Sequence, residues 1–119
     1  MFLTPEQTGL RAARRTRLDA ARLLADLEER AFTADLPLLD WQISAAGLIG
    51  EPLSAAAPDE RRAAFGAWAE HLGADVHEPA ERIHPTRVDV LRATARVPHP
   101  RASTGTVRVV LTAEIELES

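Results

Sequence analysis

An alternation of apolar and polar residues over 107–117 places the tightest limit on how this chain can fold. The polar positions carry threonine, arginine and glutamate, with Val110 as the exception, and the apolar positions are Val107, Val109, Leu111, Ala113, Ile115 and Leu117. A period of two residues is typical of a β-strand with one buried face. The strand therefore requires neighbouring strands and a layer of apolar side chains covering one of its faces.

A long N-terminal helix is predicted to supply part of that layer. Thr4, Pro5 and Gln7 have the spacing of a capping box with proline in the first turn, which predicts a helix start. We expect the helix to run over about 5–31. Its apolar arc comprises Leu10, Ala13, Thr16, Ala20, Leu23, Leu24, Leu27 and Ala31.

A second helix is predicted from Pro58 to the residue before Gly73. Proline suits the first turn of a helix and glycine suits the position after its end. Phe65 and Trp68 share one face and should anchor the helix to the core, each burial contributing about 1.5–3 kcal/mol. Gly66 either permits a close backbone approach or is simply tolerated.

The intervening segments predict further strands. Residues 39–44 alternate as a half-buried strand, and 48–53 could add a short one whose Pro52 confines it to an edge or a strand end. Residues 74–86 read as irregular because of two prolines. A strand is expected over 87–97, with a phase shift at Val90-Leu91 that predicts a bulge or burial on both faces.

In a hairpin formed by the last two strands, Arg92, Thr94 and Arg96 fall on the polar face. Some of them are expected to meet the glutamates of the final strand. The elements together predict a single α+β domain over residues 1–119. We expect a two-layer sandwich in which two helices pack on one face of a three- or four-stranded, mostly antiparallel sheet. The expected order is helix, strand or hairpin, helix, strand, strand.

Composition excludes several kinds of chemistry. The chain has no cysteine and no lysine, which removes thiolate nucleophiles, disulfides, cysteine-ligated zinc, Schiff bases and a P-loop. A net charge of −4 argues against a dedicated nucleic-acid binder. Without a signal-peptide or membrane-spanning run, we expect a cytoplasmic protein with no membrane partner. Abundant alanine and arginine, with no asparagine or tyrosine, suggest a GC-rich bacterial genome.

The stretch RAARRTR at 11–17 is the first candidate for a binding surface. Arg11, Arg14 and Arg17 have no acidic neighbour in the first helical turns, where the helix dipole also disfavours cations. They are candidate contacts to an anion or a partner, although a solvated helix face is the simpler interpretation. On the rest of the helix we expect local ion pairs: Arg15–Asp19, Asp19–Arg22 and Asp26–Arg30.

The second candidate is the segment 77–84, which contains two histidines and two glutamates. His77, Glu81 and His84 are weak candidate metal ligands, because their spacing departs from the zinc-protease signature and Pro79 opposes a helix. A polar surface loop is the simpler interpretation. The Gly-x-x-Gly at 47–50 follows a strand and lacks a basic neighbour, so we interpret it as a turn or kink and not as a nucleic-acid clamp.

No serine has the setting of a nucleophile, so the leading hypothesis is a non-enzymatic domain without a cofactor. We expect it to bind a protein partner or to self-associate, either through the edge of its final strand or through its first helix. One alternative is a nucleic-acid accessory protein that uses the N-terminal arginines, to which Arg61 and Arg62 are candidate additions. A second alternative is a small-ligand or metal-binding domain that uses the 77–84 segment.

Overall fold

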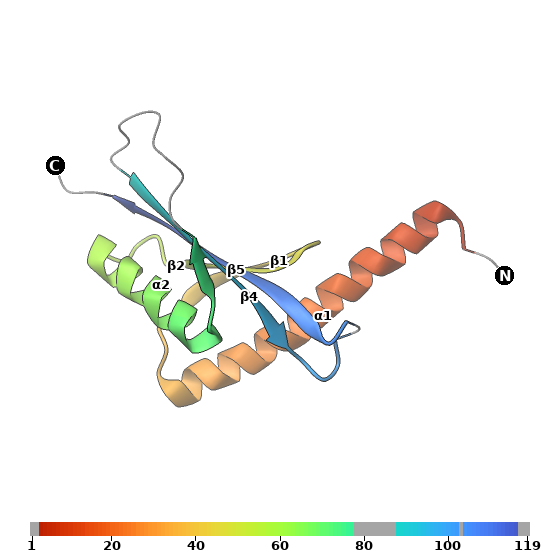
Figure 1. Cartoon of the computed structure of the whole chain (residues 1–119), viewed down its shortest axis with the longest axis horizontal. Helices are drawn as coiled ribbons and strands as arrows, with labels where there is room; N and C mark the ends of the chain where they lie inside the picture. The colour runs from red at the N-terminus through yellow and green to blue at the C-terminus, as the bar shows by residue number, and fades with distance from the viewer. Residues whose placement is uncertain (1–2, 78–87, 103, 117–119) are drawn as a thin grey trace.

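The computed structural model describes residues 3–77, 88–102 and 104–116, which form two helices and five strands (Figure 1). In chain order the elements are α1 (Pro5–Ala34), β1 (Leu39–Ser44), β2 (Gly47–Pro52), α2 (Pro58–Leu72), β3 (Asp75–His77), β4 (Val88–Pro98) and β5 (Thr106–Glu116).

The sheet has the strand order β1-β2-β5-β4-β3 and is mixed. β2 pairs in parallel with β5, and the other neighbouring strands pair antiparallel. The α+β class is therefore confirmed, whereas the expectation of three or four strands was too low. The hairpin β1–β2 forms completely, and β3 adds a short edge strand inside the segment 74–86 that was expected to be irregular. Three residues are too few to show a period of two.

The final strand was proposed as an edge offered to a partner, and that prediction is wrong. β5 lies in the middle of the sheet, with β2 on one side and β4 on the other. Its alternation is confirmed, because the five described apolar positions are all buried: Val107, Val109, Leu111, Ala113 and Ile115. A central strand in a sheet covered on one face shows the same alternation as an edge strand, so the pattern does not distinguish them.

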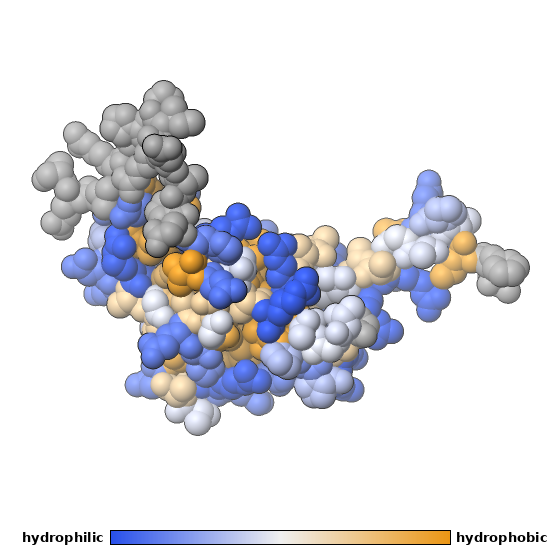
Figure 2. Space-filling view, viewed as in Figure 1, coloured by the Kyte–Doolittle hydropathy of each residue, from blue (hydrophilic) through white to orange (hydrophobic). Residues whose placement is uncertain are grey.

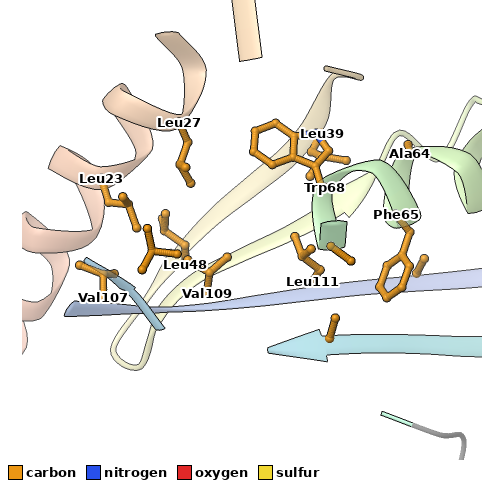
Figure 3. Close-up of a cluster of buried hydrophobic side chains, with 14 of the residues drawn as sticks. Leu23, Leu27, Leu39, Leu48, Ala64, Phe65, Trp68, Val107, Val109 and Leu111 are labelled. Carbon is orange, nitrogen blue, oxygen red and sulfur yellow. The ribbon is translucent and has the colours of Figure 1, made fainter. Parts of the chain in front are cut away.

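Both helices cover the same face of the sheet. Leu23 and Leu27 of α1 and Phe65 and Trp68 of α2 point toward the apolar side chains of β2 and β5 (Figure 3). Trp68 is 1% exposed, and its indole N–H donates to the carbonyl oxygen of Pro37 at 2.7 Å. The largest side chain in the core therefore also fixes the link that leads from α1 into β1.

Helix α2 follows its prediction closely. Pro58 lies in its first turn, and Gly73 caps its end with a φ of 61°. A Cβ placed on Gly66 would meet no atom within 4 Å, so this glycine permits no close packing and is simply tolerated.

Helix α1 confirms the predicted start but not the full predicted arc. The capping box between Thr4 and Gln7 is present, and the helix continues to Ala34. Its buried positions begin only at Asp19 and Ala20, and Leu10 is 63% exposed. Thirty residues of α-helix span about 45 Å. The helix is longer than the sheet face that it covers, and its N-terminal half stands clear of the body (Figures 1 and 2).

This projecting half makes the molecule elongated. The radius of gyration is 16.5 Å and the principal extents are 62 × 39 × 24 Å. A compact chain of this length would have a radius of gyration of about 13.5 Å. Among the described residues, neither helix is long and apolar enough to cross a membrane.

Strand β4 pairs with β5 without interruption from Val88 to Pro98. The predicted bulge at Val90-Leu91 is therefore absent. Leu91 lies on the helix-covered face and is partly buried, while Val90 is 51% exposed on the opposite face. The apparent phase shift arose because an exposed valine stands at a polar position.

Trp41 of β1 packs across Gly50 of β2, the residue directly opposite it. A Cβ placed on Gly50 would lie 2.8 Å from Cζ3 of the Trp41 ring. The same ring meets Trp68 edge-on, with 5.3 Å between ring centroids. The absence of a side chain at Gly50 therefore leaves the space that the Trp41 ring occupies.

We predict opposite effects of alanine at two glycines. Gly50→Ala pushes the Trp41 ring away from Trp68 and should lower the free energy of unfolding by about 1–3 kcal/mol. Gly66→Ala fills open space in α2 and should raise it by up to about 1 kcal/mol. Urea unfolding followed by tryptophan fluorescence measures both changes. Equal stability of the two variants would contradict the packing described for Gly50.

Candidate functional site

The solvent-facing side of α1 carries a stripe of exposed residues along nearly its whole length. We call it the outer stripe, and it lies opposite the buried Ala20, Leu23 and Leu27. Its members recur at alternating spacings of three and four residues: Arg11, Arg14, Leu18, Ala21, Ala25, Glu28 and Phe32. This is the heptad spacing with which one helix packs along another.

Two large apolar side chains of the outer stripe are exposed to water. Phe32 is 91% exposed and Leu18 is 45% exposed. At the N-terminal end of α1, Leu10 is 63% exposed and Leu3, which precedes the helix, is 44% exposed. Single exposed apolar residues are ordinary on protein surfaces, and here Leu18 and Phe32 stand on the same face of one helix with Ala21 and Ala25 between them.

The charges of α1 are separated along its length. Residues 5–18 contain four arginines and one glutamate, which gives a net charge of +3. Residues 19–34 contain four acidic residues and two arginines, which gives −2. Such a helix is complementary to an antiparallel copy of itself, because each basic half then lies beside an acidic half.

The structure places the predicted contacts Arg11, Arg14 and Arg17 on the projecting half of α1, where all three are exposed. Within the described part of the chain, no acidic side chain forms an ion pair with any of them. Arg11 and Arg14 belong to the outer stripe, whereas Arg17 lies at its margin.

The ion pairs expected within α1 are not observed. Asp26 binds His99 instead of Arg30, with 2.7 Å between Oδ2 and Nε2. Asp19 is buried at 6% exposure and lines a hollow at the end of the sheet, beneath the projecting half of α1. Arg62, an alternative nucleic-acid contact, pairs with Asp89 at 3.2 Å, and Arg61 is partly buried.

His99 is buried at the start of the β4–β5 turn, and both of its ring nitrogens have partners. Nε2 lies against Asp26, and Nδ1 accepts a hydrogen bond from the backbone N–H of Arg101 at 3.2 Å. Because Nδ1 accepts from this N–H, Nε2 carries the hydrogen that is donated to Asp26. The pair therefore ties the turn to α1.

Of the candidate metal ligands, only His77 lies within the described residues. It is exposed on β3, and its Nε2 lies 2.9 Å from the hydroxyl of Thr94. Glu81 and His84 fall outside the described residues. In ranges 3–77, 88–102 and 104–116, no three histidine or acidic side chains converge on one point.

The face of the sheet opposite the helices carries a second cluster, formed by Arg92, Arg96 and Arg108. The three side chains border hollows around Thr94. The expected pairing of β4 arginines with glutamates is wrong, because the register sets Arg92 opposite Thr112 and Arg96 opposite Arg108. Both glutamates of β5 lie opposite valines, Val88 and Val90.

Sequence reasoning missed the outer stripe and the arginine cluster for different reasons. The residues of the outer stripe recur at spacings of three and four on the polar side of the helix. Phe32 and Leu18 were not recognised there because most of their neighbours on that side are charged. The arginine cluster depends on strand register. Register shifts of two residues preserve every face assignment, so alternation alone could not predict that Arg96 meets Arg108.

We predict that the His99–Asp26 contact stabilises the fold. Asp26→Ala leaves the buried Nε2–H of His99 without an acceptor and should lower the free energy of unfolding by about 1–3 kcal/mol. Asp26→Asn retains an acceptor oxygen at the same place and serves as the matched control. Chemical denaturation measures both. Equal losses in the two variants would show that the hydrogen bond contributes nothing.

Comparison with known proteins yields no relative from which a role could be transferred. No family model, no curated protein and no solved structure matches the chain.

Proposed function

We propose that this protein is a self-associating domain that forms a symmetric homodimer by antiparallel pairing of α1 along the outer stripe. The observation that carries the proposal is the division of α1 into a basic and an acidic half, together with the exposed apolar side chains of Leu18 and Phe32 on its outer stripe. A twofold axis brings the same surface of two copies together, so the surface must complement itself. The outer stripe meets this condition.

One register satisfies both the charges and the apolar residues. When Leu18 packs next to Ala21 of the second copy, Arg11 lies opposite Glu28 of that copy. Phe32 then reaches the turn that contains Gln7 and Leu10 of the second copy, where it loses much of its contact with water. Each such contact occurs twice in the dimer because of the symmetry.

Pairing also explains why α1 extends beyond the sheet. The part of α1 before Asp19 is short for an isolated helix. A helical segment of this length is marginally stable in water on its own, because tertiary packing supplies most helical stability in proteins. No residue of α1 before Asp19 is buried in the single chain. In the proposed dimer, the projecting half of one copy packs against the supported half of the other.

A nucleic-acid accessory role is the second candidate, supported by the net charge of +3 on residues 5–18. Nucleic-acid binding and dimer formation require different properties of the helix that carries these arginines. Backbone phosphates require only positive charge, whereas the dimer requires the acidic half and the apolar residues as well. The experiments below separate the two candidates.

A charge-swap cycle tests the dimer. Arg11→Glu and Glu28→Arg should each weaken association by about tenfold, because each replaces two attractive contacts with repulsive ones. The double variant Arg11→Glu/Glu28→Arg should restore it. Sedimentation equilibrium at low ionic strength measures the dissociation constants.

Arg101→Glu, an exposed position in the β4–β5 turn, changes the net charge equally and serves as the control. A strictly monomeric unaltered protein at millimolar concentration would refute the dimer. Failure of the double variant to associate would refute the register. A gel shift with DNA that is lost in Arg11→Glu and not recovered in the double variant would support the nucleic-acid role instead.

Phe32→Ser separates association from folding. Phe32 is 91% exposed in the single chain, so the stability of the monomer should change by no more than about 0.5 kcal/mol. Its burial in the dimer should make association at least about tenfold weaker. Sedimentation and thermal unfolding at low protein concentration measure the two effects. An unchanged dissociation constant would exclude Phe32 from the interface.

A further inference from the structure

The uncovered face of the sheet holds three arginines, none of which forms an ion pair with an acidic side chain of the described residues. Arg92 and Arg96 lie on β4 and Arg108 on β5, and all three are exposed. Among residues 3–77, 88–102 and 104–116, the ion pairs are Arg62–Asp89 and His99–Asp26, and neither involves the cluster. Figure 2 shows strongly hydrophilic side chains over this part of β4 and β5.

The register forces two of these arginines together. Arg96 and Arg108 are direct cross-strand partners on the same face of an antiparallel pair. Like charges in this arrangement destabilise a sheet. The arrangement is therefore unfavourable in the isolated chain and becomes favourable when an anion lies between the two guanidinium groups.

The side chains divide the surface into two adjoining hollows that share Arg108 and Thr94. The Arg96 hollow is lined by Asp75, Thr94, Ala95, Arg96 and Arg108. The Arg92 hollow is lined by His77, Arg92, Thr94 and Arg108. Each hollow therefore presents two guanidinium groups, and one guanidinium group borders both.

We propose that these two hollows bind a linear polyphosphate group, with successive phosphates in neighbouring hollows and Arg108 contacting both. A guanidinium group donates two parallel hydrogen bonds to a phosphate, which makes arginine the preferred residue for this contact. The hydroxyl of Thr94 and the imidazole of His77, already hydrogen-bonded to each other, both line the Arg92 hollow.

Acidic side chains stand beside both hollows. Asp75 borders the Arg96 hollow and repels an anion there, whereas the Arg92 hollow has no acidic side chain among its lining residues. Glu114, on the same face of β5 opposite Val90, is a diagonal cross-strand neighbour of Arg92. Removal of the Asp75 charge should therefore favour an anion in the Arg96 hollow.

The described residues of this face include no phenylalanine, tyrosine or tryptophan, and the one aromatic ring among the residues lining the two hollows is the imidazole of His77, which is hydrogen-bonded to Thr94. The recognised chemistry is the phosphate chain itself. Free polyphosphate and the triphosphate group of a nucleotide both carry this chemistry, and they are separated in the experiment. Arg96 and Arg108 also border the hollow that Thr16 and Asp19 of α1 line, but none of the residues lining the Arg96 and Arg92 hollows belongs to the outer stripe.

Isothermal titration calorimetry with tripolyphosphate, at low ionic strength and without divalent cations, tests the proposal. We expect saturable binding at one site per chain, at least about tenfold tighter than binding of inorganic phosphate. Arg108→Gln should weaken binding by about tenfold or more, and Arg92→Gln and Arg96→Gln should each weaken it less. Asp75→Asn should strengthen it, and Arg101→Gln should leave it unchanged.

Arg108→Gln relieves the repulsion from Arg96, so its Tm without ligand should equal or exceed that of the unaltered protein, which excludes misfolding as the cause of lost binding. Equal affinity for tripolyphosphate and ATP assigns recognition to the phosphates alone, and tighter binding of ATP assigns the ligand to nucleotides. Absence of tripolyphosphate binding at millimolar concentration, or undiminished binding by Arg108→Gln, would overturn the proposal. So would tight binding of an oligothymidylate that tripolyphosphate fails to displace.

The charge-swap variants of α1 provide an independent comparison. Arg11→Glu should bind tripolyphosphate with unchanged affinity, and Arg108→Gln should associate with an unchanged dissociation constant. Failure of one proposal therefore leaves the other standing.

Discussion

The structure depends on a sheet that buries one face only, beneath two helices of unequal length. Trp68 and Phe65 hold α2 on the strands, and Leu23 and Leu27 hold the second half of α1 beside it. The apolar face of β5 runs the whole length of this contact, so burial of that face drives the two layers together. Three surfaces lie outside this contact and carry exposed side chains: the first half of α1, the outer stripe and the opposite face of the sheet.

The elements and their buried faces were predictable because local periodicity reports them directly. The capping box at Thr4, the stop at Gly73 and the alternation from Val107 onward all depend on neighbours in sequence, and all are present. Three features depend on distant parts of the chain and were missed. These are the short strand β3, the central position of β5 and the exposure of Leu10.

The candidate surfaces also divide into features set by neighbours in sequence and features set by distant parts of the chain. Arg11 and Arg14 were identified from the sequence as cations without local acidic partners, and both are exposed. Their relation to Glu28 and Phe32 emerges only when the buried side of α1 is known, since that defines which face is free. The pairing of Arg96 with Arg108 required the strand register, which the sequence pattern leaves open.

The outer stripe of α1 and the arginine cluster of the sheet suggest two separate roles, one in association and one in anion binding. The proposed α1 pairing would join two copies through their helical layers, which leaves both arginine clusters facing outward. A dimer built in this way presents two anion sites, and a ligand with repeated phosphates could engage both. Such bivalent binding raises the apparent affinity without any new contact.

Hydrogen–deuterium exchange of the backbone amides in residues 8–18, measured over a range of protein concentrations, tests the central claim most directly. In the single chain this half of α1 has no buried residue, so its amides should exchange rapidly at low concentration. Protection that rises with concentration, while the amides of β5 remain protected throughout, is the predicted result. Rapid exchange over 8–18 at every concentration would contradict the proposed pairing of α1 with a second copy.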